Sequence, residues 1–270
     1  METIIFLLLS LECIALSTIW YVYLRKKTHI RKVFLWTDNI MVFVLSIGFI
    51  FLLSVLLPFI MPYWVHLLTI PLVLGFSFIL TMFRFWRTPI RSIKAKKGEL
   101  VSPADGNVIY IKEFEAGEVP ISIKNGLNAT LSEITQTNLI NHAGWLIGIN
   151  MTPFDVHKNC IPIEGEIKLV KHIKGKFLSL KDPSALVQNE RVTVVIESAS
   201  SEIFGIVQTA SRLVRRIDTY VKEGQKVKQG DWYGMIRFGS QVDILIPKHY
   251  AIQIEVGQQV FAKSTIIAKK

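Results

Sequence analysis

The chain has 270 residues, of which 50% are apolar and 19% charged, and its formal net charge is +10. A mean hydropathy of +0.39 excludes a disordered basic tail, and two cysteines exclude a disulfide framework. Residues 1–97 contain 11 Lys or Arg against three acids, whereas residues 98–270 contain 20 against 18. Because the excess charge accompanies the most apolar third, without a recognition helix or stacking platform, no nucleic-acid partner is expected.

Three apolar stretches within residues 1–97 predict transmembrane helices. Residues 40–61 and 65–82 contain no Asp, Glu, Lys or Arg, and the segment 62–64 (Pro-Tyr-Trp) between them predicts an interfacial turn of a helical hairpin. Residues 3–24 contain one charged side chain, Glu12, and predict a third span, with two spans as the alternative. A secretory signal is disfavoured because no Lys or Arg precedes this stretch.

Basic residues flank the predicted hairpin on both sides and are absent from its turn. Positively charged loops stay in the cytoplasm, so the rest of the chain after residue 84 is expected there too, at the cell membrane. Each basic residue near the surface also attracts anionic lipid by about 1 kcal/mol. The two clusters are Arg25, Lys26, Lys27, Arg31 and Lys32, and then Arg84, Arg87, Arg91, Lys94, Lys96 and Lys97.

From residue 98 onward, short alternating segments replace the long apolar runs. They predict a mostly β (α+β) catalytic domain at residues 98–270, following a membrane anchor of N-terminal transmembrane helices at residues 1–97. A doubly wound parallel sheet is disfavoured because long crossover helices are missing. The predicted strands are residues 108–112, 145–151, 165–170, 191–197, 203–209, 217–221, 233–238 and 242–246.

An internal repeat relates residues 220–231 to residues 253–264. Both copies contain the pattern E/V-G-Q-x-V, with Gly224 and Gly257 in equivalent turns. The repeat resembles the hairpins of lipoyl- and biotinyl-type hybrid barrels, but neither copy has the lysine that such carriers modify. Two ordinary hairpins of one hybrid-barrel-like β domain are therefore expected.

Three short segments contain residues suited to catalysis. Residues 101–106 present Asp105 in a tight turn, residues 151–162 contain Asp155 and His157, and residues 237–243 place a Gly239-Ser240 pair between apolar strands. Each segment alone has an ordinary interpretation, namely a turn, a structural histidine or a bulge.

Taken together and in this order, the segments are much more specific. Residues 85–91 (FWRTPIR), 102–106 (SPADG), 153–159 (PFDVHKN), 189–191 (NER) and 234–243 (GMIRFGSQVD) resemble the short, membrane-anchored form of phosphatidylserine decarboxylase. The resemblance extends over about residues 84–247 and the apolar hairpin before them. It implies a proenzyme that cleaves itself and then acts on phosphatidylserine or a related serine phospholipid.

The resemblance also implies a role for each residue. Ser240 would attack the carbonyl of Gly239, and cleavage between them would convert Ser240 into a covalent pyruvoyl cofactor. His157 would be the base and Asp105 would orient it, as in a serine-protease triad. The pyruvoyl group would form a Schiff base with the lipid, giving phosphatidylethanolamine and CO2, and His157 with Asp155 nearby would donate the proton. The chains 1–239 and 240–270 would stay associated, no metal is expected, and a homo-oligomer is allowed.

The chain departs from the family pattern at two positions. Cys160 stands where larger relatives have a second histidine and short forms an arginine, so the division of proton transfers stays open. Thr88 replaces the usual aspartate. His172 and His249 are spare candidates for catalysis.

Two other classes of function compete with the decarboxylase. A membrane-anchored, non-enzymatic hybrid-barrel adaptor would show no cleavage. A hydrolase would use Ser240, His157 and Asp105 as a lipase-like triad, although the chain lacks the Gly-x-Ser-x-Gly elbow. The acyl chains of the lipid and an ether-linked alternative stay open.

Overall fold

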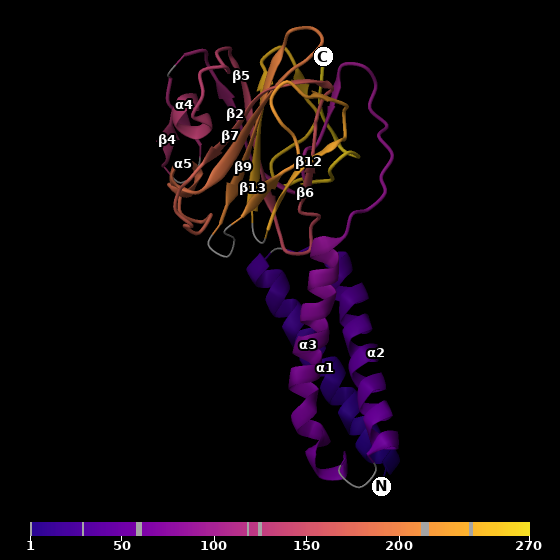
Figure 1. Ribbon diagram of the computed structural model, residues 1–270. Coiled ribbons are helices and arrows are strands. Elements are labelled where there is room, and N and C mark those ends of the chain that lie inside the picture. The colour runs from indigo at the N-terminus through magenta and orange to yellow at the C-terminus, as the bar shows by residue number, and fades with distance from the viewer. Residues whose placement is uncertain are drawn as a thin grey trace. The chain divides into compact units, whose positions relative to one another are not determined.

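A computed structural model describes residues 2–28, 30–57, 61–117, 119–123, 126–211, 216–237 and 240–270 (Figure 1). The chain divides into two compact units, Met1–Phe85 and Trp86–Lys270. The first is helical and the second is mostly β, which confirms the predicted fold class. Residues 86–97, with their basic side chains, belong to the second unit.

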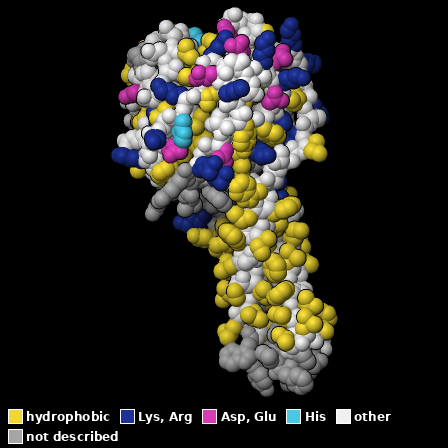
Figure 2. Space-filling model, viewed as in Figure 1, with side chains coloured by type: hydrophobic (Ala, Val, Ile, Leu, Met, Phe, Trp, Pro, Cys, Tyr) yellow, Lys and Arg dark blue, Asp and Glu magenta, His cyan; other side chains and the backbone are white. Residues whose placement is uncertain are grey.

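Three long helices make up the first unit. They are α1 (Glu2–Thr28), α2 (Lys32–Leu56) and α3 (Met61–Trp86), and each is long and apolar enough to cross a membrane. Apolar side chains cover their outer surface, whereas charged side chains are spread over the β unit (Figure 2). Exposing so many large apolar side chains is unfavourable in water and favourable in lipid. The prediction of three long apolar helices is confirmed.

The predicted turn at residues 62–64 is wrong. Helix α3 begins at Met61, so Pro62, Tyr63 and Trp64 lie in its first turn; residues 58–60 lie outside the described part. Proline is tolerated there because the first backbone N–H groups of a helix have no acceptor within the helix.

Polar contacts join the helices at the acidic residues. Glu12 of α1 contacts His66 Nδ1 at 2.8 Å and accepts a 2.7 Å hydrogen bond from Thr69 Oγ1, both on α3. The buried carboxylate of Asp38 on α2 pairs with both Nε and Nη2 of Arg84 on α3. Glu12 and Asp38 are therefore both paired, as the desolvation of a carboxylate in an apolar unit requires.

An eight-stranded sheet, antiparallel throughout, forms the body of the second unit. It is strongly curved (Figure 1), and its central strand, β13, begins at Ser240. In spatial order the strands are β11 (Lys226–Val227), β7 (Gly165–Ile173), β8 (Arg191–Glu197), β9 (Ile203–Ala210), β13 (Ser240–Pro247), β5 (Gly144–Met151), β2 (Gly106–Phe114) and β15 (Gln259–Val260).

Smaller elements cover the two faces of this sheet. One three-stranded sheet has the order β1 (Glu99–Val101), β16 (Ile266–Lys269), β14 (Ala251–Ile252), and another the order β10 (Ile217–Thr219), β12 (Trp232–Ile236), β6 (Lys158–Cys160). The pair β3 (Ile121–Ser122) and β4 (Asn128–Ala129) and the short helices α4 (Leu131–Thr135) and α5 (Ala185–Gln188) complete the unit.

The central strand contributes alternate residues to two cores. Val242, Ile244 and Ile246 belong to the larger cluster, which the small sheets close. Leu245 belongs to the second cluster, with residues of α4 and α5. This alternation is what a strand buried on both faces requires.

The two repeats occupy equivalent places. The first supplies β11, which pairs with the start of β7, and the second supplies β15, which pairs with the start of β2. The amide N–H groups of Gly224 and Gly257 donate to Ile167 and Val108 respectively, both at 2.8 Å. Each hairpin therefore caps one edge of the eight-stranded sheet, where unpaired backbone groups would otherwise remain.

Candidate functional site

The described residues on either side of the predicted cleavage bond are paired with the Met151–His157 segment. On one side, the amide of Ile236 donates to the carbonyl of His157 at 3.2 Å. On the other side, Ser240 pairs with Met151, the last residue of β5. The described residues on both sides of residues 238–239 are thus joined by backbone pairing to the two ends of one loop. Strands β12 and β13, which flank the predicted cleavage bond in the sequence, belong to different sheets.

Ser240 is held by its backbone on both sides. It is opposite Met151 on β5 and opposite Ala210 on β9. Gly239 lies outside the described residues, and the description of Ser240 covers its backbone. The residue after the predicted cut is therefore part of the central ladder and not of a loose loop.

His157 is fully buried and held in one tautomer. Its Nδ1 lies 2.9 Å from the backbone oxygen of Asp155, and because a carbonyl only accepts, Nδ1 carries the proton. Nε2 is then the basic nitrogen. Burial lowers the pKa of His157 to about 3; the Asp155 carbonyl opposes this shift and the charge of Arg87 adds to it. His157 is therefore neutral at physiological pH and able to accept a proton.

Asp155 shapes the loop that carries His157. Its carboxylate accepts hydrogen bonds from the amide of Thr152 at 2.9 Å and from Thr152 Oγ1 at 2.7 Å, while its own amide donates back to the Thr152 carbonyl. Gln259 on β15 adds a contact at 3.3 Å through Nε2. The side chain thus closes the turn, and the backbone carbonyl orients the imidazole.

Asp105 is buried and forms an ion pair with Arg91. Nη1 and Nη2 of Arg91 contact the two carboxylate oxygens, the second at 2.8 Å, and the amide of Ala262 donates at 2.8 Å. Burial alone would lower the pKa of Arg91, but the hydrogen bonds and charge of Asp105 outweigh it and raise that pKa. Among the described contacts, Asp105 and His157 have different partners, so the orienting role expected for Asp105 stays a prediction.

The turn around Asp105 nevertheless lies against the strand that follows His157. Cys160 on β6 donates its amide to the carbonyl of Pro103 at 2.8 Å, and its thiol to the carbonyl of Ser102 at 3.3 Å. Gly106 has φ +152°, and a Cβ there would lie 2.3 Å from the carbonyl oxygen of Asn150. Burial raises the pKa of Cys160 to about 12, so this thiol stays protonated at physiological pH.

Sequence reasoning missed the second role of the basic segment after α3. It treated Arg87 and Arg91 as topology signals, although both also belong to the family-like motif at residues 85–91. In the structure Arg91 neutralises Asp105 and the charge of Arg87 acts on His157. The recurrence of arginine within residues 85–91, a segment that also contains proline, could have indicated this second role.

The two spare histidines lie elsewhere. His172 pairs with Glu190 at 2.9 Å and His249 with Glu202 at 2.6 Å, and both histidine side chains are about half exposed. Within the described residues, no group of three His, Cys, Asp or Glu side chains is arranged to hold a metal ion.

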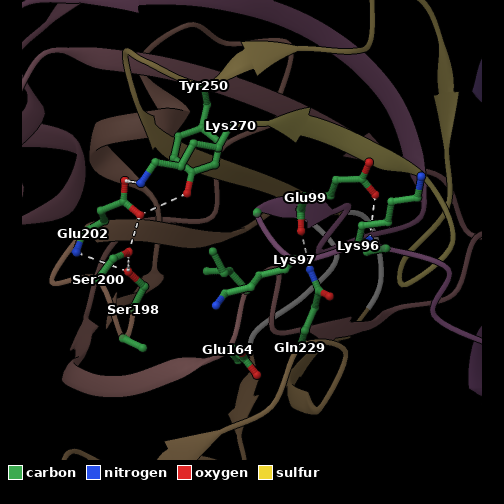
Figure 3. Close-up of a pocket in the computed structure, with 14 residues that line it drawn as sticks. Lys96, Lys97, Glu99, Glu164, Ser198, Ser200, Glu202, Gln229, Tyr250 and Lys270 are labelled. Carbon is green, nitrogen blue, oxygen red and sulfur yellow. Dashed lines mark hydrogen bonds and ion pairs between the residues drawn. The ribbon is translucent and has the colours of Figure 1, made fainter.

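A surface pocket of about 790 Å³ is also separate from these residues (Figure 3). Its wall includes Glu202, which accepts hydrogen bonds from Ser200 Oγ at 2.6 Å, Lys270 Nζ at 2.9 Å and the Tyr250 hydroxyl at 3.1 Å. Burial alone would raise the pKa of Glu202, but these hydrogen bonds and that from His249 lower it to about 2. The described lining contains none of Asp105, Asp155 and His157.

Comparison with known proteins identifies the chain's relatives. The phosphatidylserine decarboxylase family model matches residues 78–268. A phosphatidylserine decarboxylase proenzyme of Cytophaga hutchinsonii is 32% identical over 82% of this chain and 92% of its own length. A putative archaetidylserine decarboxylase proenzyme of Methanocaldococcus jannaschii is 39% identical over 72% and 92%. A Burkholderia cenocepacia phosphatidylserine decarboxylase proenzyme is 33% identical over 78% and 92%.

These matches, together with the buried site beside a strand that opens on serine, define an enzyme of the carboxy-lyase class. The chain belongs to the phosphatidylserine decarboxylase family. Because this is a family of enzymes, its match argues against the hypothesis of a non-enzymatic adaptor. The hydrolase alternative also loses its basis, because Ser240 opens a β-strand and not a helix.

Proposed function

We propose that the chain cleaves itself between Gly239 and Ser240 and then decarboxylates phosphatidylserine at the membrane surface, giving phosphatidylethanolamine and CO2. The observation that supports this most strongly is the double backbone link between the 236–240 connection and the Met151–His157 loop. It supports a role for His157, whose imidazole is neutral with Nε2 available as a base, in cleavage of the adjoining segment.

In the first step, the hydroxyl oxygen of Ser240 forms a bond to the carbonyl carbon of Gly239 while the Gly239–Ser240 C–N bond breaks. His157 accepts the hydroxyl proton at Nε2, and the freed amine of Ser240 takes up a proton, so an amide becomes an ester. Removal of the Ser240 α-proton then expels the ester carboxylate, which becomes the new C-terminus at Gly239. Addition of water to the resulting unsaturated residue releases ammonia and leaves the pyruvoyl group.

The chain fits such a group at position 240. Strand β13 is paired on both sides from its first residue, so these ladder bonds can hold the new chain end after cleavage. Chains 1–239 and 240–270 would stay together for the same reason. A pyruvoyl carbonyl supplies an electron sink for the electrons released with CO2. His157 would then return a proton to the substrate carbon, with Asp155 holding the imidazole in place.

Asp105 keeps a place in this proposal, but not as the partner of His157. Together with Arg91 it fixes the 102–106 turn against β6, the strand that begins one residue after His157. We infer that this buried pair sets the position of the loop, and that its loss slows cleavage without removing the base.

The names of the relatives and the three apolar helices support the proposed substrate and location. The relatives' names specify phosphatidylserine or archaetidylserine, which share a serine headgroup and differ in the lipid backbone. Three helices able to cross a membrane suit a lipid substrate. By the positive-inside rule, the basic flanks favour a cytoplasmic β unit at the cell membrane.

Two variants test this function. Ser240→Ala should give one full-length, inactive band, because residue 240 can then neither attack nor become a pyruvoyl group. His157→Gln should also stay uncut. Decarboxylation of phosphatidylserine by purified Ser240→Ala protein, measured as CO2 release in lipid–detergent micelles, would exclude the proposed origin of the cofactor.

A further inference from the structure

Arg216 and Arg237 share the carboxylate of Asp218, and Arg237 is two residues before Gly239 at the proposed cleavage bond. Arg216 Nε lies 2.8 Å from Asp218 Oδ1, and Arg237 contacts Asp218 Oδ2 through Nε at 2.9 Å and Nη2 at 2.8 Å. The amide of Arg237 also donates to the carbonyl of Arg216 at 3.3 Å, so the two residues are neighbours across β10 and β12. Two positive charges and one negative charge leave a net charge of +1.

This cluster is open to solvent. The side chains of Arg216 and Arg237 are 70% and 39% exposed, whereas that of Asp218 is 16% exposed. The less exposed Asp218 carboxylate therefore orients two guanidinium groups that remain accessible to solvent. Among the described contacts, Arg216 uses only Nε, so its two Nη groups have capacity for a further acceptor.

Arg237 of this cluster also contacts a tryptophan. The guanidinium carbon of Arg237 lies 5.7 Å from the ring centre of Trp86. Trp86 is the last residue of α3, which is long and apolar enough to span the bilayer. Tryptophan side chains at the ends of membrane spans favour the interface with water, so Trp86 suits a position near lipid headgroups.

The chemistry of a serine phospholipid matches this arrangement. Its phosphodiester is joined to the reacting amine only through Cα, Cβ and one oxygen. Arg237 is three residues before Ser240, which puts their Cα atoms at most about 11 Å apart, within the combined reach of an arginine side chain and a headgroup. A phosphodiester has one negative charge, which would balance the net charge of the cluster, and guanidinium groups bind phosphate oxygens in pairs.

We propose that Arg216 and Arg237, held by Asp218, bind the phosphodiester of the lipid substrate while its amine reaches residue 240. The proposal rests on the proposed function, because it takes residue 240 as the reacting centre. It assigns the recognition of the phospholipid to a site that is distinct from the buried loop of His157.

The test compares Arg237→Gln and Arg216→Gln with Lys168→Gln, which removes one positive charge from an exposed ion pair at Glu166 and Glu197. Each cleaved, purified enzyme is assayed with dihexanoyl phosphatidylserine and with its phosphotriester, in which methylation removes the negative charge. For the diester, we expect each arginine variant to raise KM about tenfold with kcat within about twofold. For the triester, KM should be high for the wild type and unaffected by the arginine variants.

Other results overturn the proposal in distinguishable ways. If wild-type protein is uncut or inactive, the proposed function fails, and this inference with it. If the wild type is active and KM is unchanged in both arginine variants, or changes equally for diester and triester, the cluster is a structural ion pair only. If both arginine variants stay uncut while Lys168→Gln is cut, the arginines act in processing and not in lipid binding.

Discussion

The buried Arg91–Asp105 pair gives the sharpest energetic prediction. The side chain of Asp105 is 1% exposed, and its carboxylate accepts two hydrogen bonds from Arg91 and one from the amide of Ala262. Arg91→Gln would leave a buried carboxylate with the Ala262 amide as its main donor. Removing one partner of such a pair costs about 3–5 kcal/mol, so we expect a loss of that size in the free energy of unfolding.

Asp105→Asn should lower the free energy of unfolding by less than Arg91→Gln does. The Arg91 side chain is 16% exposed and keeps a 3.0 Å hydrogen bond to the carbonyl of Ala262. The double variant should be more stable than the sum of the single losses predicts, with a coupling energy of about 2–3 kcal/mol. The unfolding free energies are to be measured in detergent, all in the Ser240→Ala background, so that every protein is one uncut chain. Additive losses, with coupling near zero, would refute the inference that Arg91 neutralises Asp105.

Three further predictions concern the loop and the turn beside it. Because burial lowers the pKa of His157 to about 3, cleavage of newly translated chain should proceed at nearly the same rate at pH 5 and pH 8. If His157 had its usual pKa, the cleavage rate at pH 5 would be about 30-fold lower than at pH 8. A fall of that size would contradict the buried environment assigned to His157. Cys160→Ala should still be cut, since its thiol stays protonated; an uncut but folded variant, judged by circular dichroism, would give Cys160 a role in proton transfer. Gly106→Ala should lower the melting temperature by several degrees, because its Cβ would overlap the carbonyl of Asn150, and an unchanged melting temperature would show that the turn can relax.

The fold could largely be predicted from the sequence because apolar and polar residues alternate regularly along its strands. The predicted strand at residues 191–197 coincides with β8, and the other seven predictions fall on strands with small differences at their ends. The helix boundary at Pro62 was misplaced because a proline is equally compatible with a break and with a first helical turn. Local sequence does not distinguish these two cases.

The candidate site was predicted less completely. The order of the motifs identified Asp105, His157 and Ser240 as candidate residues. It did not predict which group each carboxylate contacts. The orientation of His157 depends on a backbone carbonyl, which no residue type reveals. The Arg91–Asp105 pair depends on how two segments fold against each other, and Arg91 already had a sufficient explanation as a topology signal. Contacts of this kind follow from the tertiary fold alone.

The most direct test of the central claim is the mass of the chain that begins at residue 240. Purified, active protein is denatured and its intact masses are measured, with a second sample reduced by borohydride. The account predicts two chains, residues 1–239 with a free C-terminal carboxylate and residues 240–270 with a pyruvoyl group in place of Ser240. Borohydride should raise the mass of the second chain by two hydrogens and abolish activity. A single uncut chain with an intact serine, in a preparation that decarboxylates phosphatidylserine, would contradict it.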